Sequence, residues 1–155
     1  MSVLFFLLKK FKTLFTTFDT NTFYMTLKET IGAVEKFHDA FGIENNYSPT
    51  VNLSTEEIAL RHRLMQEEND EYEEAAKNGD IVEVADALGD QLYILCGTIL
   101  KHGLQFKIEE VFNEIQRSNM SKLDENGKPI YRKDGKIMKS SNYFKPNIEG
   151  IIAND

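Results

Sequence analysis

The sequence contains little cysteine, little proline and no tryptophan: one cysteine and three prolines occur in 155 residues. The single cysteine, Cys96, excludes an internal disulfide and any zinc site built from cysteines, and it fits a reducing compartment. Because Cys96 lies in an apolar run, we expect it to be a small core residue. With 41% hydrophobic and 28% charged residues, the composition is that of one globular domain.

Motifs of several enzyme classes are also absent. The sequence has no Walker A glycine loop, no Ser–His–Asp arrangement and no cofactor fingerprint. Glu35 and His38 form one Glu-x-x-His pair, whereas a di-iron helical bundle needs two such pairs. Any chemistry is therefore expected to rest on other groups.

The first 24 residues differ in composition from the rest of the chain. Their apolar run, residues 3–8, is too short to span a bilayer, and basic residues follow it, which is the wrong order for a secretory signal. We expect no stable membrane span. A transit-like or membrane-surface segment remains open. A non-native start is an equal alternative, because Met25 begins a clean helical pattern. We assign residues 1–24 to an N-terminal extension and residues 25–155 to the domain. The expected location is the cytoplasm, or an organelle if the extension is a transit segment.

The net charge of −7 conceals an uneven distribution. Thirteen acids and three bases lie between residues 44 and 93, whereas eight bases and three acids lie between residues 117 and 145. The acidic middle argues against nucleic-acid binding and suits divalent cations, while the basic segment suits phosphate. Together they indicate a substrate made of metal and phosphate.

Hydrophobic periodicity predicts helices and no strand before residue 120. Ser54 and Glu57 form a capping box at the start of one helix, and Asp80 caps the next. The predicted fold is an all-α, four-helix, up-and-down bundle with a basic C-terminal segment that is irregular or forms a short hairpin. The four predicted helices cover residues 26–41, 54–77, 80–102 and 107–119.

Acidic side chains on the second and third helices carry the chemical signal. Glu68 falls on the stripe of the second helix that should face the core, with Glu71 one turn away. A buried carboxylate costs several kcal/mol unless a cation compensates it. The third helix is so apolar that we expect it to be buried on most sides, yet one of its faces carries three acids. These are Glu83, Asp86 and Asp90.

Two helices joined by a tight turn are thus expected to point four carboxylates at one another: Glu68, Glu71, Glu83 and Asp86. Such a group does not stay ionised without cations between its members. Oxygen ligands alone favour Mg²⁺, or Mn²⁺, over zinc. For Glu83 an alternative is open, since it could instead be the reciprocal partner of the Asp80 cap.

The motifs Glu68-x-x-Glu71 and Glu83-x-x-Asp86 resemble the ExxE…ExxD signature of the all-α nucleoside-triphosphate pyrophosphohydrolases. This superfamily includes MazG, the dimeric dUTPases and phosphoribosyl-ATP pyrophosphohydrolase, and the last of these branches is the most similar. Its stretches match LMQEENDEYEEAA, EVADALGDQLYILCGT and QRSNMSKLDENGKPIYRKDGKIMKSSNYFKP here. The resemblance covers roughly residues 28 to 150. Gln91 replaces an apolar residue and Ser140-Ser141 replaces Gly-Pro, and neither change touches the acids.

The resemblance implies that the four motif acids bind Mg²⁺ and that Glu67 and Glu68 take part in catalysis. Glu67 would support the ligands or activate water, and Asp90 would be a further ligand or a supporting residue. Basic residues of the C-terminal segment would hold phosphate, and Asn119 would contact metal or nucleotide. These basic residues are Lys122, Lys136 and Lys139.

The expected reaction is attack of water on the α-phosphorus of a (d)NTP, which yields the monophosphate and pyrophosphate. We favour dUTP or a related nucleotide. One alternative is hydrolysis of phosphoribosyl-ATP in histidine biosynthesis, and another is a non-enzymatic helical module that binds metal or nucleotide. We also expect a homodimer or homotetramer, because the bundle leaves four residues partly unaccounted for: Tyr93, Ile94, Gly97 and Leu100.

Overall fold

The computed structural model describes residues 25–154, and the predictions made for residues 1–24 lie outside this range. The described chain forms two compact units. Residues 25–43 and 52–98 make up the first unit, and residues 44–51 and 99–154 make up the second. No helix among the described residues combines the length and the apolar character needed to cross a bilayer.

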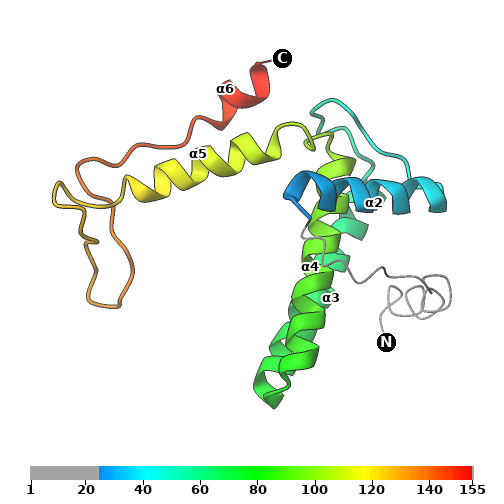
Figure 1. The fold of residues 1–155 in the computed structure, drawn as a ribbon, viewed down its shortest axis with the longest axis horizontal. Coiled ribbons are helices and arrows are strands. Elements are labelled where there is room, and N and C mark those ends of the chain that lie inside the picture. The colour runs from blue at the N-terminus through cyan, green and yellow to red at the C-terminus, as the bar shows by residue number, and fades with distance from the viewer. Residues whose placement is uncertain (1–24, 155) are drawn as a thin grey trace. The chain divides into compact units, whose positions relative to one another are not determined.

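The first unit contains α2 (Leu27–Phe41), α3 (Thr55–Asn78) and most of α4 (Ile81–Lys101) (Figure 1). The predicted helix starts are confirmed, because both Thr26 and Ser54 form capping boxes with the glutamate three residues later. Each box satisfies backbone N–H groups that a helix start leaves without a partner. Glycines with left-handed backbone follow α2 and α3.

Helices α3 and α4 run side by side in opposite directions, and α2 packs against them (Figure 1). The Gln91 side chain on α4 donates a hydrogen bond of 3.2 Å to the backbone carbonyl of Glu68 on α3. The ring of Phe37 on α2 meets Tyr93 edge-on at a centroid distance of 5.6 Å. Cys96 is fully buried, as predicted, among other core residues of this unit. These include Ile31, Val34, Ala75, Ala87 and Ile94.

The expectation that α4 is buried on most sides is wrong for the single chain. Leu88, Leu92 and Leu95 are each nearly half exposed, and they line an open apolar hollow together with Met65. Of the four residues expected to be unaccounted for, Ile94, Gly97 and Leu100 are instead buried, and Tyr93 is half-buried. The reason is geometric: α2 and α3 cover one side of α4, and three leucines spaced by three and four residues share the side that they leave open.

The second unit is organised around the end of α4 and around α5 (Ile108–Met120). Residues 44–51 pack on the last turn of α4, where the Asn46 N–H donates to the Leu100 carbonyl and Lys101 Nζ donates to the Glu44 carbonyl at 2.9 Å. Gly103 ends this part of the chain with φ +66°, and a Cβ there would lie 2.1 Å from the Ser48 carbonyl oxygen. Only glycine fits so close an approach.

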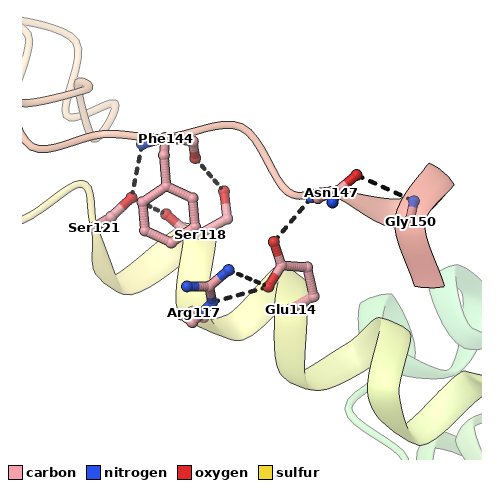
Figure 2. A network of polar contacts seen from close by, with 7 residues as sticks. All are labelled: Glu114, Arg117, Ser118, Ser121, Phe144, Asn147 and Gly150. Carbon is pink, nitrogen blue, oxygen red and sulfur yellow. Dashed lines mark hydrogen bonds and ion pairs between the residues drawn. The ribbon is translucent and has the colours of Figure 1, made fainter.

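The C-terminal segment returns along α5 and ends in a short helix, α6 (Ile148–Ala153), which the sequence did not predict (Figures 1 and 2). Ser118 Oγ donates to the Phe144 carbonyl at 2.8 Å, and the Phe144 N–H donates to Ser121 Oγ at 3.2 Å. The Arg117 guanidinium lies over the Phe144 ring at 4.7 Å. These contacts make the segment an ordered part of the second unit.

Between α5 and Phe144 the chain forms tight turns. Asp124 accepts backbone N–H groups around the first turn, and Tyr131 and Ile137 form one isolated antiparallel bridge across the second. Of the two predicted alternatives, the segment is therefore mainly irregular and contains a minimal hairpin. The all-α class is confirmed, while the up-and-down order of four helices stays a prediction because α5 belongs to the second unit.

A buried carboxylate, Glu114, joins α5 to the C-terminal segment (Figure 2). Its Oε1 accepts the Asn147 N–H at 2.8 Å, and its Oε2 accepts Arg117 Nε at 2.9 Å. The Asn147 N–H, and after it Arg117, lower the pKa of Glu114 below its ordinary 4.5. Because a lowered pKa favours the folded state when the group is ionised, this stabilisation is present above pH 4.5 and is lost as the pH falls through the lowered pKa.

Replacing Glu114 by glutamine is therefore expected to destabilise the second unit at neutral pH and to reduce the loss of stability on acidification. Thermal unfolding followed by circular dichroism between pH 3 and pH 7 measures both effects. Glu110→Gln is a matched control, because Glu110 lies one turn earlier on α5 and is exposed. Parallel pH profiles for the wild type and the Glu114 variant would contradict the assignment.

Candidate functional site

Six carboxylates of the first unit form the acidic cluster, and they come from facing segments of α3 and α4. The antiparallel packing of the two helices places Glu68 level with the Asp90–Gln91 turn, as the hydrogen bond from Gln91 to the Glu68 carbonyl shows. It places the later acids of α3 opposite the earlier acids of α4. The members of the cluster are Glu67, Glu68, Glu71, Glu83, Asp86 and Asp90.

Glu68 is the buried centre of this cluster, with only 1% of its surface exposed. Burial, and after it the charges of Glu71, Asp90, Glu67 and Asp86, together raise the pKa of Glu68 from 4.5 to about 7. Water would solvate an exposed carboxylate and keep its pKa low. The prediction that Glu68 faces the interior among other acids is therefore confirmed, and the crowding has a measurable electrostatic consequence.

The pKa values of two neighbours of Glu68, Glu71 and Asp90, are also raised. Partial burial and the charge of Asp86 raise the pKa of Glu71, and burial and Asp86 likewise raise the pKa of Asp90. Asp86 acts on all three of these acids although it is itself exposed. The site is thus a concentration of negative charge around one buried carboxylate, and a cation placed there would relieve several repulsions at once.

Two buried oxygens in the cluster have no hydrogen-bond partner: Glu67 Oε2 and Glu68 Oε2. A buried carboxylate oxygen without a donor loses the stabilisation that water gave it, at a cost of about 1–3 kcal/mol. Hard divalent cations such as Mg²⁺ bind such oxygens. The orphaned oxygens and the all-oxygen donor set therefore fit a divalent cation of this kind.

Among residues 25–154, no three His, Cys, Asp or Glu side chains already stand in a metal-binding arrangement. Metal binding would therefore require changes of side-chain rotamer. Glu71, Glu83 and Asp86 are exposed, so packing does not hold their side chains in place. Glu68, in contrast, is fixed by burial, which makes it the member around which the others would arrange.

Glu83 is not a reciprocal cap of α4 in this structure. Asp80 Oδ1 accepts the N–H groups of Val82 and Glu83 at 3.0 and 3.2 Å, whereas the Asp80 N–H donates to the Ala75 carbonyl. The Glu83 carboxylate is thus left to the acidic cluster, where its charge acts on Glu71.

The other predicted site residues all lie in the second unit. Lys122 Nζ donates to Asn119 Oδ1 at 2.7 Å, so these two form a pair at the end of α5. Lys139 Nζ lies 4.2 Å from the centre of the Tyr143 ring, a cation–π contact. Lys136 is exposed in the turn closed by the bridge between Tyr131 and Ile137. Their contact with phosphate stays a prediction.

Sequence reasoning missed two polar residues that approach Gly97 of α4, His38 and Arg61. His38 is buried, with 3% of its surface exposed, and Arg61 extends from α3 toward Gly97. Arg61 lies seven residues before Glu68 on α3, a spacing that puts both residues on the same face of the helix, and this spacing was the available signal. His38 was tested only as a metal ligand, and nothing in its spacing indicated a neighbour on α3.

A family model described as phosphoribosyl-ATP pyrophosphohydrolase matches residues 34–119, more than half of the chain. This range contains the whole acidic cluster together with His38, Arg61 and Asn119. A search of curated proteins finds no match. The family match agrees with the resemblance inferred from the paired acidic motifs.

Proposed function

Since this chain belongs to the phosphoribosyl-ATP pyrophosphohydrolase family, we propose that it is a Mg²⁺-dependent pyrophosphohydrolase that cleaves (d)NTPs between the α- and β-phosphates. The observation that supports this proposal is the buried Glu68, whose pKa is raised to about 7 within a cluster of acids from two helices. Such a carboxylate indicates a functional site rather than a solvated helix face.

Four acids would hold the metal in this proposal: Glu68, Glu71, Glu83 and Asp86. The bound ions would neutralise charge on the phosphates and the leaving pyrophosphate, and Mn²⁺ would serve in place of Mg²⁺. Glu67 has a buried orphaned oxygen next to Glu68, which suits a residue that orients water or takes its proton. Asp90, half-buried and level with Glu68, would support the cluster from the side of α4.

Residues of the second unit would meet the phosphates. Lys122, Lys136 and Lys139 are the candidates, and Asn119 would position Lys122 through their hydrogen bond. A lysine is a compact point charge that suits a flexible polyphosphate. The basic composition of residues 117–145 supports this assignment.

The substrate proposed first is dUTP or a related nucleotide. The second candidate is phosphoribosyl-ATP, which the family match itself favours. Both contain the same bond and use the same leaving group, so the acidic cluster serves either. The residues around the base and sugar decide between them.

The direct test is to incubate the protein with Mg²⁺ and a panel of NTPs, dNTPs and phosphoribosyl-ATP, and then to separate the products. We expect monophosphate and pyrophosphate in equal amounts, with the best substrate identified by kcat/KM. Diphosphate and phosphate would contradict the cleavage site. Nucleotide binding without turnover on any substrate would support the non-enzymatic module instead.

We further propose that a second copy of the chain covers Leu88, Leu92 and Leu95, as part of a homodimer or a homotetramer. Three half-exposed leucines on one helix face leave apolar area in water that burial would stabilise by about 25 cal/mol per Å². Leu92→Glu should then shift the mass measured by light scattering from oligomer to monomer, whereas Ile58→Glu, at an exposed position of α3, should not. A monomeric wild-type protein would refute this proposal.

A further inference from the structure

A half-open apolar cavity of about 340 Å³ lies within the first unit and is lined mainly by α2, α3 and α4. Its size falls within the range of small-molecule sites in proteins, which are concave, mainly apolar, and carry a few well-placed polar groups. Aromatic rings from α2 and α4 line it, and two nitrogen-bearing side chains, His38 and Arg61, reach into the lining. The predicted reaction does not account for any of these residues.

The cavity lies one helical turn from the acidic cluster on both α3 and α4. Leu64 of the lining precedes Glu68 by one helical turn on α3, and Ile94 of the lining follows Asp90 by one turn on α4. Residues so spaced have Cβ atoms roughly 5–6 Å apart. Tyr93, which lines the cavity, also lies close to the cluster, because burial and then the charge of Asp90 raise the pKa of Tyr93. A molecule with its phosphates at the cluster could therefore extend into the cavity.

Three aromatic rings give the cavity flat walls. The rings of Phe37 and Phe41 lie 4.4 Å apart and are inclined by 30°, and Tyr93 meets Phe37 edge-on at 87°. Flat, apolar surfaces of this kind suit planar heterocycles, since every nucleobase has a π-face that stacks on an aromatic side chain. The sugar–phosphate part of a nucleotide has no such complementarity here.

Gly97 brings the two polar side chains of the lining to one point. A Cβ on Gly97 would lie 3.0 Å from Arg61 Nη1 and 3.1 Å from His38 Nε2. The missing side chain thus leaves room for two nitrogens on the floor of the cavity. Burial lowers the pKa of Arg61, but a guanidinium stays charged and can only donate hydrogen bonds. Glu57, one turn earlier on α3, acts on it electrostatically from outside the lining.

We infer that this cavity binds the nucleobase of the substrate and that Arg61 selects bases with a keto oxygen, namely guanine and uracil or thymine. At the same ring position adenine and cytosine carry an amino group, which is a donor and would face the Arg61 donor unpaired. An arginine that reads such an acceptor typically discriminates against the wrong base by a factor of roughly 5 to 150. The inference rests on the proposed function for its substrate class, and it opposes the adenine-containing phosphoribosyl-ATP.

Binding measured without metal tests recognition of the base separately from metal-dependent hydrolysis. Isothermal titration of GMP, UMP, AMP and CMP in EDTA should show the keto bases bound about tenfold more tightly. Arg61→Met should bring the four affinities within about twofold of one another. The matched control Arg63→Met, on the exposed face of α3, should leave the preference unchanged.

Two further variants test the walls and the floor of the cavity. Phe37→Leu keeps apolar volume and removes a ring, so all four monophosphates should bind more weakly by a factor of roughly 5 to 100. Gly97→Ala should weaken all four because its Cβ displaces Arg61 or His38. Circular dichroism of each variant confirms that the fold is kept.

The outcomes distinguish this inference from the proposed function. Triphosphate turnover with Mg²⁺ but without any base preference, or with a preference insensitive to Arg61, would overturn the cavity assignment and leave the function in place. Keto-selective binding without turnover would support the cavity assignment and contradict the proposed function. Variants that change thermal stability alone would show that the cavity serves packing rather than recognition.

Discussion

Glu68→Gln is expected to lower kcat for triphosphate hydrolysis about a thousandfold at saturating Mg²⁺. A bound metal contributes several kcal/mol to stabilising the transition state, and each 1.36 kcal/mol corresponds to a factor of ten in rate. Glutamine keeps the shape of the side chain but removes the negative charge that would bind the ion. Steady-state kinetics with pyrophosphate detection measure the change.

Folding stability separates a lost ligand from a damaged fold. In the absence of metal, Glu68→Gln should raise the melting temperature, because it removes a buried charge crowded by Glu71 and Asp90. Glu74→Gln is the matched control, since Glu74 is an exposed acid of the same helix, and it should leave both kcat and stability unchanged. A Glu68 variant with wild-type turnover would refute the proposed metal site.

Mg²⁺ is expected to stabilise the protein strongly at pH 8 and weakly at pH 5. The folded pKa of Glu68, about 7, lies above its ordinary 4.5, so the folded state binds a proton more tightly than the unfolded state does. The contribution of Glu68 to stability without metal is therefore fully present below pH 4.5 and is lost as the pH rises through 7. Mg²⁺ can take the place of the proton only where the carboxylate is ionised.

A melting series in 10 mM MgCl₂ or in NaCl of equal ionic strength, at pH 5 and pH 8, measures this difference. If the ion is present at about 100 times its Kd, it contributes about 2.7 kcal/mol, or roughly 5–10 °C for a chain of this size. Glu68→Gln should flatten the pH dependence and reduce the shift by Mg²⁺. Equal shifts at both pH values would contradict the involvement of Glu68.

Helix boundaries followed from local chemistry and were predicted well. Ser54 and Glu57 form a capping box because their side chains reach backbone groups three residues away, whatever the rest of the fold does. The later helix α6 escaped prediction because its six residues are held by Asn147 and by Glu114 from α5, a contact between distant parts of the chain. The exposed side of α4 was not predicted either, because it depends on how α2 and α3 pack against this helix.

The acidic cluster could be predicted from sequence because its acids recur at helical spacing and because charged residues are unexpected on so apolar a helix. Three acids on one face of a very apolar helix, facing two more across a tight turn, leave few structural explanations. The cavity beside it was not accessible. Phe37, Arg61 and Gly97 belong to three helices, and nothing in their spacing relates one to another.

The sequence by itself determined the helices, their caps and the identity of the six acids, since helix periodicity and capping act within a few residues of the chain. Tertiary structure alone decided how completely Glu68 is buried, at 1% exposure, and that Glu71 one turn away stays exposed. It also decided which side of α4 is left uncovered and that His38 and Arg61 both approach Gly97. These outcomes depend on how α2, α3 and α4 pack, because burial and charge coupling arise between side chains that are distant in sequence and close in space.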